Sequence, residues 1–251
     1  MVRDRPARHA VRTMSGVLGG GGAENAGVST RARPAAPGPA PGLDPRGEWS
    51  LLLLSAASGA ADAFAFICVG QVFAGVMTGN LVLLGISATG GGEHGVALRV
   101  ITSLIAYGIG VGCGAWMTER LRWSLPVILL AEVALLTAGA ALWALDPTTS
   151  GGGRLGLLVL IAAAMGIQGR IRATPTNYFT GTLTALVGRA ALRSWEQRDR
   201  WVAGRLLAVV VGAAVTALAV RLWPGAAAAV AALPTAGALF VETWRRRPSV
   251  G

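Results

Sequence analysis

Lysine is absent from this chain of 251 residues, and charged residues of any kind make up only 14% of it. A soluble domain averages about 25% charged residues. Hydrophobic residues make up 53% of the chain, and the mean hydropathy is +0.56. The shortage of charge therefore argues against a soluble globular protein and favours a membrane protein.

Histidine and cysteine are also scarce, with two of each. His9 and His94 have no partner at the spacing of metal ligands, and Cys68 and Cys113 lie in apolar segments. No CxxC, GxSxG, HExxH or P-loop pattern occurs. These motifs carry metal binding, nucleophilic catalysis and phosphate binding, so we expect no metal site, no cofactor and no enzymatic activity.

All of the basic side chains except the two histidines are arginines, and they give a net charge of +10. A basic chain can bind nucleic acid, but that requires basic residues clustered on one face. Here the arginines lie between apolar runs and at the two ends. This distribution is typical of anchoring to an anionic bilayer surface, so we expect the lipid bilayer as a partner and no nucleic acid.

The first 46 residues are rich in Ala, Gly, Pro and Arg and show no apolar period. Such a segment cannot bury enough surface to offset its ordering entropy, so we expect residues 1–46 to form a disordered cytoplasmic tail. No apolar core of a signal peptide follows the arginine-rich start, so a cleaved signal is not expected. Residues 47–247 are predicted to form a single transmembrane domain.

Six stretches are apolar enough to cross a bilayer, which takes about 17–25 residues. They are residues 49–69, 96–117, 124–145, 155–168, 201–222 and 225–243, of which the fourth is short and is expected to extend back toward Gly152. Seven of the eight tryptophans fall at the ends of these stretches, where an aromatic belt is expected. The sequence therefore predicts an all-α, polytopic transmembrane helix bundle.

Two further apolar segments, residues 72–88 and 177–190, each contain a Thr-Gly pair, and we expect a break there because glycine is unfavourable inside a helix. If both cross the membrane, there are eight spans; if both enter and return on one side, there are six. With six spans and a cytoplasmic N-terminus, only Arg99, Arg154 and Arg221 of the arginines between spans lie outside. With eight spans, five arginines lie outside, so the positive-inside rule favours six and places both termini in the cytoplasm of the cell.

The two Thr-Gly pairs also indicate an internal repeat. A shift of 102 positions lays Thr78-Gly79 on Thr180-Gly181 and Gly110 on Gly212. Each half, about residues 50–145 and 152–243, then has three spans and one interrupted segment. An odd number of spans per half makes the halves inverted in the membrane, as in many secondary transporters.

Acidic residues within the predicted spans are rare. Asp62 lies about two-thirds of the way along the first span. A carboxylate at membrane depth is costly and usually faces a cavity or a partner. Asp62 could bind a proton or a cation, or it could be held for packing, and both interpretations stay open. Glu132 is nearer a helix start, where we expect snorkelling or capping, and we interpret Arg205 and Glu242 as interfacial.

Polar residues of the two Thr-Gly segments form the candidate solute site. If the two breaks meet at mid-membrane, half-helix ends there would coordinate an ion or a small polar solute. The alternative is that these groups only bond helices together. The candidate binding residues are Asp62, Gln71, Thr78, Gly79, Asn80, Gln168, Asn177, Thr180, Gly181 and Thr182.

Four alternate glycines, at positions 108, 110, 112 and 114, form small-xxx-small patterns in the run YGIGVGCGA. Small residues at this spacing let two helices approach closely. The contact predicted by this pattern lies either within the chain or between the two copies of a homodimer.

Two motifs resemble the YoaK-like bacterial membrane proteins, a family defined by a domain of unknown function. The first family pattern falls on Ala61, Asp62, Ala63, Gly70, Phe73, Met77, Thr78, Gly79 and Asn80. The second falls on Gly166, Gln168, Thr176, Thr180, Gly181, Thr182 and Leu183, with Gly169 in place of an asparagine. The resemblance covers about residues 50–243 and implies the fold and a membrane location, but no substrate.

The sequence thus favours a small transporter or permease of the inner or plasma membrane, with its site between the two Thr-Gly segments. The alternative is a membrane scaffold or accessory subunit without transport, in which the polar groups join helices.

Overall fold

The computed structural model describes residues 45–91, 93–148, 150–171 and 179–246. In these ranges the chain forms helices and no strand, which confirms the predicted all-α class. The helices are α1 (Pro45–Phe64), η1 (Ala65–Gly70), α2 (Met77–Ala88), α3 (Val96–Glu119), α4 (Leu125–Leu145), α5 (Gly152–Arg170), α6 (Phe179–Ala191), α7 (Gln197–Leu222), η2 (Pro224–Val230) and α8 (Ala232–Arg245). Residues 1–44 of the expected tail lie outside the described residues.

Six helical segments are long and apolar enough to cross a membrane. They are Gly47–Gly70, Val96–Glu119, Leu125–Leu145, Gly152–Arg170, Gln197–Leu222 and Pro224–Arg245, in which η1 extends α1 and η2 precedes α8. These segments coincide with the six predicted spans. The two Thr-Gly segments form the much shorter helices α2 and α6, of 12 and 13 residues. The chain is therefore a multi-pass membrane protein.

Large apolar side chains cover the outer faces of the long helices. On α3, Ile105 and Ile109 are 58% and 60% exposed, and on α7, Leu207 and Val210 are each 63% exposed. A soluble monomer rarely leaves so much contiguous apolar surface in water. These helix faces are therefore suited to contact with the hydrocarbon of a lipid bilayer.

Helices α1 and α7 touch through their backbones. A Cβ atom placed on Gly59 would lie 2.1 Å from the carbonyl oxygen of Val209. On the facing helix, a Cβ atom on Gly212 would lie 2.0 Å from the carbonyl oxygen of Ala56. Neither glycine can therefore carry a side chain without separation of the two helices.

Helices α3 and α5 make the same kind of contact. A Cβ atom on Gly110 would lie 2.2 Å from the carbonyl oxygen of Ala163, and one on Gly166 would lie 2.2 Å from that of Tyr107. Gly108 and Gly112, by contrast, face open space. Of the four alternate glycines of α3, the contact within the chain therefore uses Gly110 and also Gly114, whose Cβ would lie 3.3 Å from Ile167.

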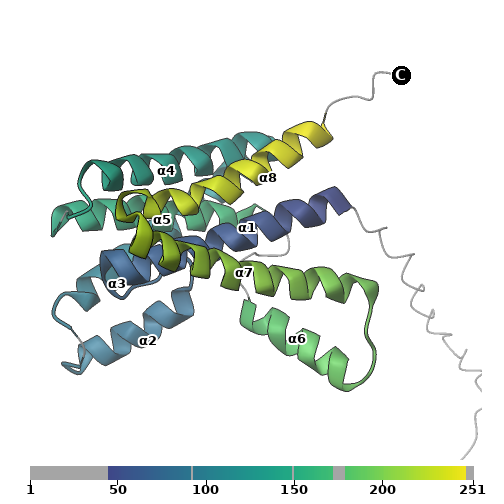
Figure 1. Ribbon diagram of the computed structural model, residues 1–251, viewed down its shortest axis with the longest axis horizontal. Coiled ribbons are helices and arrows are strands. Elements are labelled where there is room, and N and C mark those ends of the chain that lie inside the picture. The colour runs from purple at the N-terminus through teal and green to yellow at the C-terminus, as the bar shows by residue number, and fades with distance from the viewer. Residues whose placement is uncertain (1–44, 92, 149, 172–178, 247–251) are drawn as a thin grey trace, which may run out of the picture. The chain divides into compact units, whose positions relative to one another are not determined.

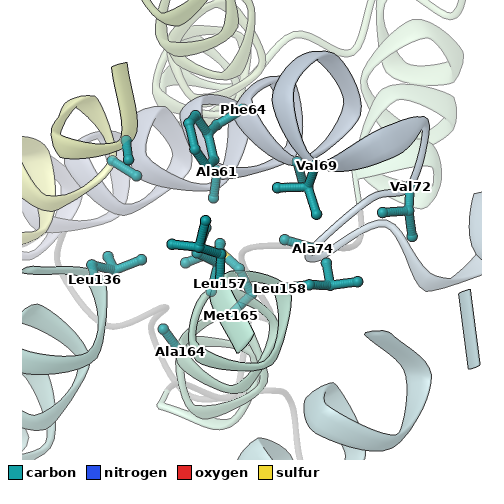
Figure 2. Packing of buried hydrophobic residues seen from close by; sticks show 14 of the residues in the cluster. Ala61, Phe64, Val69, Val72, Ala74, Leu136, Leu157, Leu158, Ala164 and Met165 are labelled. Carbon is teal, nitrogen blue, oxygen red and sulfur yellow. The ribbon is translucent and has the colours of Figure 1, made fainter. Parts of the chain in front are cut away.

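The core lies between α1, η1, α4 and α5 and includes the loop that follows η1 (Figure 2). Val72 and Ala74 of this loop are completely buried, next to Val69 at the end of the first span. The ring of Phe64 meets the ring of Trp143 edge to face, with centroids 5.1 Å apart. This apolar packing draws the loop back into the helices, and that placement creates the candidate site.

Candidate functional site in the membrane interior

The carboxylate of Asp62 binds the loop that precedes α2. Its Oδ1 accepts a hydrogen bond of 2.7 Å from the backbone N–H of Gly75, and the N–H groups of Ala74 and Val76 also point to the carboxylate. Asp62 lies eight residues before Gly70, about 12 Å along the helix at about 1.5 Å per residue. The chain therefore turns back after the first span to the depth of Asp62.

The reversal takes place at two residues with left-handed backbone. Gly70 has a φ of 131° and Gln71 a φ of 56°. The conformation of Gly70 favours glycine, and the guanidinium group of Arg99 lies close to it, 2.7 Å from where a Cβ atom would stand. Gln71 then donates a 2.9 Å hydrogen bond from Nε2 to Oε1 of Glu93, just before α3. The segment between Gln71 and Glu93 thus begins and ends at the same end of the bundle.

Asn80 fastens the loop to the start of α2. Its Oδ1 accepts a 2.9 Å hydrogen bond from the N–H of Phe73, and its Nδ2 donates a 2.7 Å bond to the carbonyl oxygen of Phe73. Ser103 on α3 donates to the same carbonyl oxygen over 2.7 Å and accepts from Asn80 over 3.2 Å. Asn80 and Ser103 are both fully buried. Together they satisfy backbone groups that would otherwise be unpaired in the apolar interior.

These contacts make α2 a half-length helix. Ser103 lies seven residues into α3, about 10 Å from its start, so the loop reaches similar depths on α1 and α3. From there α2 runs outward for 12 residues. That is about 18 Å, whereas the hydrocarbon core of a bilayer is about 30 Å thick. The geometry therefore favours the six-span alternative for the first Thr-Gly segment.

The interruption does not lie at the Thr-Gly pair itself. Thr78 and Gly79 form the first turn of α2, and the irregular backbone precedes them at residues 71–76. Thr78 is exposed, whereas Gly79 packs against the ring of Phe73, which a Cβ atom would approach to 3.1 Å. Thr180 and Gly181 likewise fall in the first turn of α6, and both are exposed.

The candidates in the second half are not gathered into the Asp62–Asn80 network. Gln168, at the end of α5, is buried and donates a 2.8 Å hydrogen bond to the carbonyl oxygen of Leu54 on α1. Thr182 is half-buried and lines a pocket at the opposite end of the helices. Asn177 lies outside the described residues. In Figure 1, α2 and α6 are drawn along one side of the long helices, with their N-terminal ends toward the middle of the view.

A pocket of about 660 Å³ opens where α1 and α7 begin. It is lined by Glu48, Leu51, Leu125, Thr182, Ala185, Arg189, Arg198, Val202, Arg205 and Arg245, which come from five helices. Arg205 binds Glu48, with Nη2 and Oε2 2.6 Å apart. Compared with four other pockets formed by the described residues, this pocket has the most charged side chains in its lining.

A family profile described as a protein of unknown function (DUF1275) matches residues 50–241. The chain belongs to the DUF1275 family. The match extends from the first to the last predicted span and includes both Thr-Gly segments. No curated protein and no solved structure matches the chain. The site of this DUF1275 protein is therefore interpreted from its own geometry, and the name YoaK-like stays a prediction.

The interpretation of Glu132 in this DUF1275 chain as a snorkelling or capping residue is wrong. Its side chain is completely buried between α4 and α8, and neither carboxylate oxygen forms a hydrogen bond of normal geometry within the described part of the chain. Thr235 of α8 is its polar neighbour. A position one-third along an apolar helix looks interfacial in sequence, and only the packing of α8 over it shows that it is enclosed.

Sequence reasoning also missed Ser103 and the pocket arginines. Ser103 follows Thr102 in an otherwise apolar run, and nothing in that run indicates that its hydroxyl binds the carbonyl oxygen of Phe73. Arg205 is 14% exposed in its side chain and ion-paired to Glu48, 157 positions away. No local pattern predicts a partner at such a separation.

Proposed function

We propose that this DUF1275 protein is a small permease whose solute passes between the N-terminal ends of α2 and α6. The observation that carries the proposal is the half-length helix α2, which begins at membrane depth and is held there by Asp62, Asn80 and Ser103. Irregular backbone at membrane depth is tolerated where it is covered by protein or lines a cavity. Paired interrupted segments are typical of transporter binding sites.

The close helix contacts support an inverted repeat. The contact of α1 with α7 and the contact of α5 with α3 use corresponding residues. The contact residues of α1 correspond to those of α5 at one constant offset in residue number, and the contact residues of α3 correspond to those of α7 at a second constant offset. The equivalent pairs are Ala56 and Ala163, Gly59 and Gly166, Tyr107 and Val209, and Gly110 and Gly212. A shared spacing along both helix pairs is expected if the two halves pack by the same rule in opposite orientations.

In this proposal the protein lies in the inner or plasma membrane of a bacterial cell, and the arginines support the cytoplasmic placement of both termini. Arg99, Arg154 and Arg221 lie near one end of the long helices. The other described arginines lie near the end where α1 begins and α8 ends, and they are Arg46, Arg120, Arg122, Arg170, Arg189, Arg193, Arg198, Arg200, Arg205, Arg245 and Arg246. Cytoplasmic loops carry the excess of basic residues, so the second end is assigned to the cytoplasm.

In this proposal Asp62 and Asn80 form the frame of the site, because their polar atoms are engaged with the loop. The groups left to contact a solute are the first turns of α2 and α6. Thr78 and Thr180 are exposed there, and the N-terminal turn of a helix carries partial positive charge. A small solute with hydrogen-bond acceptors suits these groups.

Proteoliposomes test the proposal. Their shrinkage is followed by light scattering after exposure to glycerol, urea, ammonium acetate or sodium phosphate. We expect at least one solute to pass faster than in protein-free liposomes, and a Thr78→Trp variant to slow it. Ile109→Trp, on the outer apolar face of α3, is the matched control and should leave the rate unchanged.

A scaffold without transport remains the second candidate, because Asn80, the buried residue of α2, is engaged in contacts within the chain. The two functions differ in water access. A Thr78→Cys variant in a Cys68→Ala, Cys113→Ala background should react with a charged, water-soluble thiol reagent if the protein is a permease. Reactivity as low as that of Ile109→Cys, together with no accelerated flux, would favour the scaffold.

A further inference from the structure

The lining of the pocket where α1 and α7 begin has more positive than negative side chains. Four arginines line it, Arg189, Arg198, Arg205 and Arg245, against the single acid Glu48. The surrounding acids Asp199 and Glu242 pair with Arg189 and Arg245. A cavity lined mainly by cations attracts anions from solution.

One of the four arginines keeps its donors for a ligand. Arg198 is exposed and makes no hydrogen bond or short ion pair with the described part of the chain. In Arg205, Nη2 binds Glu48 and the buried Nε has almost no accessible surface, so Arg205 contributes mainly its charge to the pocket.

We propose that this pocket is a binding site for a phosphate-type oxyanion. The planar guanidinium group presents its N–H donors in a fork that matches the oxygens of phosphate or carboxylate. The volume of about 660 Å³ exceeds that of inorganic phosphate and suits an organic phosphate or a lipid headgroup. Anion binding itself is independent of the permease proposal, but a role as the entrance for a transported anion rests on it.

The location fits an entrance to the membrane interior. The pocket extends from the surface arginines to Thr182, which belongs to the second Thr-Gly segment, and its lining residues come from α1, α4, α6, α7 and α8. An anion held by Arg198 and Arg205 would therefore lie next to α6 rather than on the outer surface.

Phosphate binding by the purified full-length protein tests the site. The protein is placed in phosphatidylcholine nanodiscs and titrated calorimetrically with sodium phosphate at constant ionic strength. We expect saturable binding that Arg198→Gln weakens about tenfold, since a charge-assisted hydrogen bond is lost. Arg198 is chosen because Arg205→Gln would leave Glu48 without its partner and could disturb folding.

Two matched variants separate the pocket from general surface charge. Arg200→Gln removes the same charge two residues away on α7 but outside this pocket, and it should change the affinity less than twofold. Ala185→Leu fills the pocket without a change in charge and should weaken binding as Arg198→Gln does. Equal weakening by Arg198→Gln and Arg200→Gln would overturn the proposal.

A second series distinguishes the two sources of the anion. If a lipid headgroup occupies the pocket, replacing part of the phosphatidylcholine by phosphatidylglycerol should abolish phosphate binding. This effect of phosphatidylglycerol should require Arg198. If phosphatidylglycerol has no effect, the ligand is a free oxyanion. Absence of any Arg198-dependent response to phosphate or to phosphatidylglycerol would overturn the site. Binding without flux in proteoliposomes would instead refute the permease and leave the site intact.

Discussion

Two buried carboxylates in this protein have opposite surroundings. Asp62 accepts a hydrogen bond from Gly75 and faces two further backbone N–H groups, whereas both oxygens of Glu132 lack hydrogen bonds within the described residues. Removing the donors from a buried acceptor such as Asp62 destabilises the fold. A buried carboxyl that has no partner, such as Glu132, already destabilises it in the native protein. The same chemical group is therefore stabilising at one position and a burden at the other. The sequence drew attention to Asp62 and underrated Glu132, because the difference depends on chain segments remote from each acid.

Substitution by the neutral amides should separate the two carboxylates. Asp62→Asn replaces one acceptor oxygen by an NH₂ group that faces backbone donors, and we expect a loss of about 1–3 kcal/mol in unfolding free energy. Glu132→Gln keeps the size and leaves a group that cannot ionise, so stability should be unchanged or higher. Thermal unfolding of both variants in the same detergent checks this. A Glu132→Gln protein less stable than Asp62→Asn would contradict the assignment.

Single elements were predicted with unequal success. The long spans follow from apolar length alone, and all six were placed within a few residues of the observed helices. The half-helix α2 was anticipated, but the break was expected at Thr78-Gly79 and lies at residues 71–76. No sequence pattern near residues 71–76 predicts the hydrogen bonds that place the break there. Asn80 binds Phe73, seven residues earlier, and Ser103 binds it from another helix.

Glycine positions give a test at the level of helix pairs. Gly110→Ala and Gly212→Ala each place a Cβ atom within about 2 Å of a backbone oxygen, and we expect each to cost about 3 kcal/mol or to abolish folding. Gly108→Ala and Gly112→Ala on the open face of α3 should leave stability nearly unchanged. Thermal unfolding of the four variants is the measurement. Similar losses at Gly108 and Gly110 would show that α3 and α5 do not pack as described.

At the scale of the whole molecule, the proposed topology combines six spans with two half-helices that would enter the membrane from opposite ends. The arginine distribution favoured this topology from sequence, and the bond between Gln71 and Glu93 gives it a physical basis at one end. At the other end, Arg189 of α6 binds Asp199 in the first turn of α7 through Nε and Nη2. This pairing fastens the end of α6 to the start of the next span.

Labelling of two loops tests this topology most directly. His94→Cys and Ser194→Cys, both at exposed positions, are made separately in a Cys68→Ala, Cys113→Ala background. Each is treated with a membrane-impermeant maleimide in intact cells and after lysis. Six spans place the loops on opposite sides, so one cysteine should label in intact cells and the other only after lysis. Eight spans place both loops on the same side, and the same labelling pattern for both cysteines would contradict the re-entrant half-helices.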